Sequence, residues 1–289
     1  YLACPLRFYL HEVLGMEPLD DRAREPDARA FGTLVHDALD DMAEEGAALW
    51  GCGDAEKLGQ WLEERLRERV RRQYGVRPWL GVDLAIDSAA RRLRAFSFRQ
   101  VAWHQEGWEI VQHEQTRRCT LGGLTIKGRI DRIDRNTRTG AVAVLDYKTS
   151  DKARTPAEVH FGPRRKSEQV APEALVPDTL AKNKRWADLQ LPLYRELVRA
   201  ELGSGFLTGY ILLPSALGSG GFALWDGYCD ALQTSALACA QAVIKRIRAG
   251  IFWPPGELAG GYRDDFAGLL LDNPETTMER PPAPWRAAP

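Results

Sequence analysis

The segment Ala141-Val142-Ala143-Val144-Leu145 is apolar without interruption. Successive side chains of a β-strand point to opposite faces, so a strand with this sequence has to bury both of its faces. Segments rich in β-branched residues precede it at 108–120 and 124–135, separated by Gly122-Gly123, as in an antiparallel meander. We therefore predict an α/β fold with a central sheet, in which residues 141–148 form an inner strand covered on both sides.

Helical periodicity covers much of the first hundred residues. Apolar residues recur at spacings of three and four from Phe31 to Met42, from Ala55 to Gln73 and from about Leu84 to Gln105. Two further helices are expected at about 186–202 and 226–249. A glycine-rich pair of strands is expected to separate them.

These patterns predict the organisation of the chain. Residues 1–106 form a helical N-terminal part, 107–255 form the core, and 256–289 form a proline-rich tail. A long excursion is expected at about 151–185, and an excursion of this length inside a domain is usually functional or disordered. Because the chain begins with Tyr1 rather than Met, we expect one structural domain excised from a longer chain.

Composition bears on the cellular setting. The uncharged stretch Leu202–Trp225 contains six glycines and Pro214, which favour two strands over a membrane helix, so we expect no membrane segment. Five cysteines, none of them in a CxxC pair, favour a reducing compartment, and we predict a cytoplasmic location.

Charged side chains gather at the end of the predicted inner strand. Asp146 and Lys148 are two residues apart and share a face, while Asp131 lies on the preceding strand within reach of Asp146. Converging carboxylates repel each other unless a cation lies between them, and oxygen ligands favour Mg²⁺ or Mn²⁺. An isolated Asp-x-Lys is commonly a surface ion pair, but the additional Asp131 favours a metal-dependent site.

The order of several motifs resembles the PD-(D/E)XK nuclease superfamily, specifically its RecB and AddB branch. The matching segments are Gly128-x-x-Asp131, Asp146-x-Lys148, Gln190-x-x-x-Tyr194, Cys4–Leu10 and Phe31–His36. The resemblance covers residues 1 to about 255. It implies a restriction-endonuclease-like mixed β-sheet flanked by helices, with a helical N-terminal region.

The resemblance also implies catalytic roles for three residues and a set of metal ligands. Lys148 would orient or help deprotonate the attacking water and stabilise the charged phosphorane, acting with Asp131 and Asp146. The implied ligands of Mg²⁺ or Mn²⁺ are His36, Asp131, Asp146 and the Tyr147 carbonyl.

Gln190 and Tyr194 are implied to position DNA, although a Gln and a Tyr one turn apart are also common on a helix rim. His36 shares a helix stripe with Gly32, whose missing side chain would let that helix approach the sheet closely. Outside the motif, a lone His is more often structural.

Two further carboxylates compete for the site. Asp134 points to the opposite face of the strand that carries Asp131, so we expect it to pair with a neighbouring Arg instead. Glu114, on the strand before the hairpin, is a weaker candidate that could reach the site.

Many members of this branch hold an iron–sulfur cluster with one N-terminal and three C-terminal cysteines. The chain has Cys4 but no cysteine after Trp253, so we expect no iron–sulfur cluster and an ordinary core role for Cys4. The N-terminal helices would then be tied to the C-terminal tail by packing. Cys229 and Cys239 are interpreted as small buried residues.

The net charge of −1, from 39 basic and 40 acidic residues, excludes nucleic-acid binding by bulk charge. Local patches must then contact DNA. Arg164–Lys166 and Lys182–Arg185 are candidates for phosphate contacts, although solvated loops explain each cluster equally well.

Three functions are consistent with these patterns. The first is a Mg²⁺- or Mn²⁺-dependent deoxyribonuclease, an exonuclease acting at DNA ends in recombination or repair beside a helicase, in the same chain or as a partner subunit. The second is a catalytically inactive DNA-binding or scaffolding domain with the same fold. The third is a metal hydrolase with another substrate.

Overall fold

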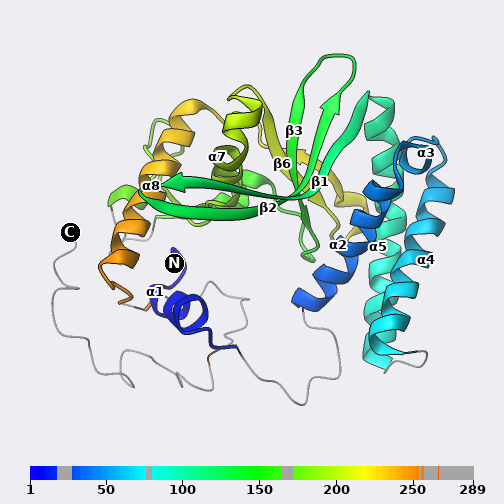
Figure 1. Ribbon diagram of the computed structural model, residues 1–289, viewed down its shortest axis with the longest axis horizontal. Helices are drawn as coiled ribbons and strands as arrows, with labels where there is room; N and C mark the ends of the chain where they lie inside the picture. The colour runs from blue at the N-terminus through cyan, green and yellow to red at the C-terminus, as the bar shows by residue number, and fades with distance from the viewer. Residues whose placement is uncertain (18–27, 76–79, 165–171, 254, 257–265, 267–289) are drawn as a thin grey trace.

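The computed structural model describes residues 1–17, 28–75, 80–164, 172–253, 255–256 and 266. Its centre is a five-stranded sheet with the strand order β1-β2-β3-β6-β7 (Figure 1). The pairing of β3 with β6 is parallel, and the other three pairings are antiparallel. The strands are β1 (Trp108–Leu121), β2 (Leu124–Asn136), β3 (Val142–Lys148), β6 (Leu207–Leu212) and β7 (Gly221–Leu224).

Helices cover both faces of this sheet (Figure 1). On one face Ala143, Leu145 and Tyr147 of β3 join a core with the N-terminal helices, and on the other Val144 joins a core with the C-terminal helices. The predicted mixed sheet flanked by helices, with β3 buried on both sides, is therefore confirmed. The N-terminal helices are α2 (Ala28–Glu45), α3 (Ala47–Trp50), α4 (Ala55–Tyr74) and α5 (Leu80–Gln105); the C-terminal ones are α7 (Gln190–Leu202) and α8 (Asp230–Arg248).

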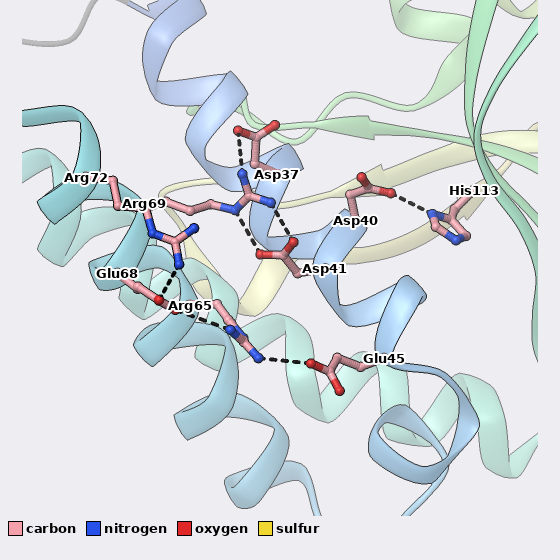
Figure 2. Close-up of polar contacts among 9 residues, drawn as sticks. All are labelled: Asp37, Asp40, Asp41, Glu45, Arg65, Glu68, Arg69, Arg72 and His113. Carbon is pink, nitrogen blue, oxygen red and sulfur yellow. Dashed lines mark hydrogen bonds and ion pairs between the residues drawn. The ribbon is translucent and has the colours of Figure 1, made fainter.

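Ion pairs join α2 to α4 and to the sheet (Figure 2). Arg69 of α4 donates to Asp41 at 2.8 and 2.5 Å and to Asp37 at 3.3 Å, and His113 of β1 lies 2.6 Å from Asp40. These residues are half-buried, and ion pairs that remain accessible to solvent add little stability individually. Together they fix the rotation of α2 about its axis.

The excursion between β3 and α7 contains more structure than its proline content predicts. Thr155 caps α6 (Pro156–His160) with a capping box, and β4 (Phe161–Pro163) pairs with β5 (Lys184–Trp186). A short 3₁₀ helix, η2, spans Pro172–Ala174. Trp186 is fully buried in β5, so the helix expected from about 186 begins instead at Gln190.

The N-terminal segment packs against residues near the other end of the chain. It forms α1 (Pro5–Phe8) and the π-helix η1 (Tyr9–Val13), and Cys4 clusters with Trp253 and Phe266. The Cys4 sulfur also accepts a hydrogen bond from the Gly256 backbone N–H at 3.2 Å. Packing thus connects these segments, as the sequence predicted.

The expectations about Cys229, Cys239 and a membrane segment can also be compared with the structure. Cys239 is buried, but the expectation that Cys229 is buried is wrong, because it is an exposed residue at the N-cap of α8. In the part of the chain that the structure describes, none of the helices has the length and apolar character needed to cross a membrane.

A fully buried ion pair stabilises the sheet behind the predicted site. Arg132 donates to both carboxylate oxygens of Asp134 at 2.7 and 2.6 Å, and Trp103 of α5 donates to the same carboxylate at 2.7 Å. Arg132 also donates to Gln100 at 2.7 Å. The expectation that Asp134 pairs with a neighbouring Arg is therefore confirmed.

The substitution Asp134→Ala should destabilise the protein by about 3–5 kcal/mol, because it leaves the Arg132 guanidinium buried without its counter-charge. Urea denaturation followed by tryptophan fluorescence measures this change. Arg135→Ala, at an exposed position next to it, is the matched control and should change stability by less than about 0.5 kcal/mol. A loss below about 1 kcal/mol for Asp134→Ala would contradict the role of this pair.

Candidate active site

Asp131 and Asp146 lie side by side on neighbouring strands. The β2–β3 ladder pairs Arg132 with Leu145, and one step further along it places Asp131 next to Asp146. Both carboxylates are buried, with exposed fractions of 8% and 3%. The Tyr147 backbone N–H donates to Asp131 Oδ2 at 2.9 Å, which satisfies one of these oxygens.

Lys148 and two residues of α7 complete the surroundings of Asp146. Lys148 Nζ lies 2.7 Å from Asp146 Oδ2 and donates to Gln190 Oε1 at 2.7 Å. Gln190 Nε2 donates to Asp146 Oδ1 at 2.7 Å, and the Tyr194 hydroxyl donates to the same oxygen at 3.3 Å. The structure thus brings Asp146, Lys148, Gln190 and Tyr194 together.

His36 approaches the carboxylates from α2. Its Nδ1 lies 3.7 Å from Asp131 Oδ2, and its ring meets the Tyr147 ring edge-on at 5.4 Å. One turn earlier, a Cβ at Gly32 would lie 3.3 Å from Thr149 Oγ1, so the glycine permits the close approach of α2. Burial lowers the pKa of His36, which favours the neutral imidazole that binds metals.

Glu114 joins the site through an unusual backbone conformation. Its φ of 49° is in the left-handed region, and the β1–β2 register shifts nearby, between Ile110 and Gln112. His36, Glu114 and Asp131 each offer a ligand atom, and these atoms lie within 4.8 Å of one another. The residue that the sequence ranked as a weaker candidate therefore belongs to the most compact group of potential metal ligands in the described part of the chain.

The implied ligand set overlaps only partly with this group. Asp146 lies beside Asp131, but its two oxygens contact Lys148, Gln190 and Tyr194. The Tyr147 backbone N–H donates to Asp131 and the Tyr147 ring contacts the His36 ring, which places Tyr147 at the same site.

Burial and a neighbouring carboxylate determine the protonation of Asp131. Burial, followed by the charge of Asp146, raises the pKa of Asp131 to about 8, while the Tyr147 N–H opposes the shift. Without a cation, the Asp131 carboxyl therefore retains its proton at neutral pH. A site that lacks enough positive charge for its carboxylates fits a divalent cation.

The sequence did not single out a buried network behind Lys148. His160, at the end of α6, is fully buried between the Tyr210 hydroxyl, 2.8 Å from Nε2, and the Asp188 carbonyl, 2.8 Å from Nδ1. Lys148 Nζ lies 4.9 Å from the centre of the Tyr210 ring, and the Asp188 carboxylate accepts from the Gln190 N–H at 2.6 Å. The network therefore supports both Lys148 and Gln190.

Arg92 of α5 plays a similar part on the other face of the sheet. It is buried and donates to the carbonyls of Thr149 at 2.6 Å and Leu213 at 3.2 Å. It also donates to Asp151 at 2.5 Å. These contacts fix the chain where it leaves β3, directly after Lys148. The sequence could not predict this role, because Arg92 is one of several charged residues in the periodic pattern of α5.

Comparison with known proteins identifies the superfamily of the chain. A family model for the PD-(D/E)XK nuclease superfamily matches residues 1–212, so the chain belongs to this superfamily. A crystal structure of a candidate exonuclease from Eubacterium rectale aligns with a TM-score of 0.48 and 13% sequence identity, covering 96% of this chain and 83% of the other. Among curated proteins, none matches the sequence.

The raised pKa of Asp131 predicts a pH-dependent stability in EDTA. Its protonated form stabilises the folded state fully below about pH 4, and this contribution is lost as the pH rises through about 8. Relative to Asp131→Asn, the wild type should lose up to about 1.4 kcal/mol of unfolding free energy per pH unit in this window. Urea denaturation at pH 5, 6, 7 and 8 measures the difference. The exposed control Asp226→Asn should show no such trend, and a pH-independent difference for Asp131→Asn would rule out the proposed protonation.

Proposed function

We propose that this protein is a metal-dependent deoxyribonuclease of the RecB and AddB type. The observation that supports this most strongly is the convergence of Asp131, Asp146 and Lys148 at the end of β3, with His36 reaching them from α2. Membership of the PD-(D/E)XK nuclease superfamily supports phosphodiester hydrolysis as the reaction.

The donor set fits a hard divalent cation, and we propose Mg²⁺ or Mn²⁺. His36, Glu114 and Asp131 would hold it, with Asp146 and the Tyr147 carbonyl at the edge of the site. When bound, the cation lowers the pKa of a water molecule and neutralises charge on the phosphate.

The side chains around the cation site have separate tasks in this proposal. Lys148 places a fixed positive charge beside the scissile phosphate and orients the attacking water. Asp146 and Gln190 hold its ammonium in place. Gln190 and Tyr194, one turn apart on α7, position the DNA strand beside Asp146. The buried Tyr210 ring limits the positions that the Lys148 ammonium can adopt.

The biological setting that we propose rests on the motifs shared with the RecB and AddB branch. These are Cys4–Leu10, Phe31–His36 and Gln190–Tyr194. They support an exonuclease that acts at DNA ends in recombination or repair, in the cytoplasm, beside a helicase in the same chain or in a partner subunit.

Lys148→Ala should lower Mg²⁺- or Mn²⁺-dependent cleavage of end-labelled linear DNA by at least about a hundredfold, because it removes a charge used at the phosphate. Gel electrophoresis of the products measures the rate. Lys152→Ala removes an exposed positive charge four residues away and should retain the wild-type rate. Equal rates for the two variants would refute the role of Lys148.

The same assay tests end dependence and the inactive alternative. Closed circular DNA should remain intact under conditions in which linear DNA is degraded. If the wild type binds DNA but cleaves neither substrate with either metal, the protein is instead a catalytically inactive DNA-binding domain.

Metal binding distinguishes the ligands. His36→Ala and Glu114→Gln should each weaken Mn²⁺ binding by at least about tenfold, because the first removes a donor atom and the second replaces a charged carboxylate with a neutral amide. Calorimetric titration with Mn²⁺ measures the affinity without relying on activity. The exposed controls His11→Ala and Glu64→Gln should bind as the wild type does. An unchanged affinity for Glu114→Gln would remove Glu114 from the ligand set.

A further inference from the structure

The β1–β2 hairpin extends beyond the rest of the sheet and has a polar outer face. β2 has 13 residues but β3 only 7, so residues 124–131 of β2 lie beyond the residues that pair with β3. In Figure 1 the hairpin reaches from the sheet to α8. Six exposed residues that alternate along the two strands form this surface, which we call the hairpin face: Thr116, Arg118, Thr120, Thr125, Lys127 and Arg129.

The opposite face of the hairpin is packed against the C-terminal helices. A Cβ at Gly128 would lie 2.5 Å from the Leu197 side chain of α7, and Leu121 packs with Ile244 of α8. Arg248 of α8 donates to the Gly123 carbonyl at 2.6 Å and so holds the hairpin tip. Because side chains alternate along each strand, this packing fixes the direction in which the hairpin face points.

The charges of Arg118 and Lys127 on the hairpin face are not explained by contacts among the described residues. Arg118 lies directly opposite Lys127 in the ladder, and like charges in this position destabilise a hairpin. Neither side chain has an acidic partner among the residues that the structure describes. Arg129 forms an ion pair with Glu114, but 62% of its side chain is exposed. The hairpin face itself contains no carboxylate and no large apolar side chain.

The hairpin face leads directly to the candidate active site. Arg129 lies two residues before Asp131 on the same strand and pairs with Glu114 of the potential metal group. Thr125 is four positions before Arg129 in β2, which corresponds to roughly 14 Å of strand. Arg248 adds a cation at the tip. Positively charged side chains are therefore present near the carboxylates, along the hairpin face and at the hairpin tip.

We propose that the hairpin face binds the phosphate backbone of the DNA segment adjoining the scissile bond. Arg118 and Lys127 contact phosphates, while the Thr hydroxyls add hydrogen bonds, so this binding is independent of base sequence. The absence of large apolar side chains on the hairpin face argues against a protein partner, whose interface core is usually apolar and aromatic. The inference rests on the proposed nuclease function and identifies where its substrate lies.

The test is the salt dependence of DNA binding by the double variant Arg118→Gln/Lys127→Gln. Fluorescence anisotropy in EDTA, with a labelled 20-nucleotide oligothymidylate or a duplex of the same length, gives the affinity from 50 to 300 mM NaCl. Losing two phosphate contacts should reduce the slope of log K against log[salt] by about 1.4 for the single strand or about 1.8 for the duplex. At 50 mM salt, the affinity should fall by roughly tenfold or more.

Two further variants separate this effect from a general loss of charge or of folding. Arg71→Gln/Arg91→Gln removes two exposed positive charges from α4 and α5 and should keep the wild-type slope. Arg118→Lys keeps the charge and should keep the slope as well. The thermal unfolding midpoint of Arg118→Gln/Lys127→Gln should equal or exceed that of the wild type, because the substitutions remove a like-charge contact.

A reduced slope with either DNA supports the proposal, and the substrate with the larger change identifies the form that is bound. A wild-type slope for Arg118→Gln/Lys127→Gln with both substrates overturns it, and so does the lack of measurable binding by the wild type at 50 mM salt. The measurement is made without metal and does not depend on cleavage. Failure of the nuclease function would instead appear as a lack of metal-dependent cleavage by the wild type.

Discussion

The side-by-side burial of Asp131 and Asp146 is the constraint on which the rest of the site depends. Two carboxylates on neighbouring strands repel each other, and burial makes their ionised forms more costly still. Neighbouring groups offset this cost unequally for the two carboxylates. Asp146 is contacted by Lys148, Gln190 and Tyr194, whereas Asp131 is contacted by one backbone N–H and a neutral His36. The lack of a positive counter-charge is thus greatest at Asp131. This residue lies next to Glu114, in the compact group of potential ligands. In the proposed function, a divalent cation would offset the repulsion that this arrangement creates.

The strands that carry this strained pair are stabilised from behind. On β2 the side chain after Asp131 points to the other face, where Arg132 and Asp134 form a fully buried ion pair held by Trp103 and Gln100 of α5. The two-residue period of β2 therefore places the Asp131 carboxylate and the buried ion pair behind it within four consecutive residues. The His160 network and Arg92 do the same for β3, by fixing the Tyr210 ring near Lys148 and the carbonyls that follow Lys148.

Local periodicity was sufficient to predict the inner strand, the shared face of Asp146 and Lys148, and the close approach of His36 beside Gly32. These features depend on residues within a few positions of one another. The closeness of Glu114 to His36 and Asp131 could not be predicted, because its position depends on a left-handed backbone conformation and a register shift that the sequence does not mark. His160 and Asp188 belong to a proline-rich excursion whose order comes from distant partners such as Tyr210 and Trp225. Cys229 was misjudged because α8 begins four residues later than its pattern suggested, which leaves Cys229 at the exposed N-cap.

The near-zero net charge conceals an arrangement that only the fold reveals. β2 changes character along its length: the segment paired with β3 contributes buried charges, and the segment beyond β3 carries exposed cations on one face and packs Gly128 against α7 on the other. A hairpin that merely closed the edge of the sheet would gain stability from opposite charges at Arg118 and Lys127. Keeping two cations opposed there makes sense if an external anion neutralises them, and a nuclease in this superfamily meets a polyanion at each turnover. On this proposal, β2 would contribute Asp131 to the cation site at one end and cations for the phosphate backbone at the other, without requiring a basic protein overall.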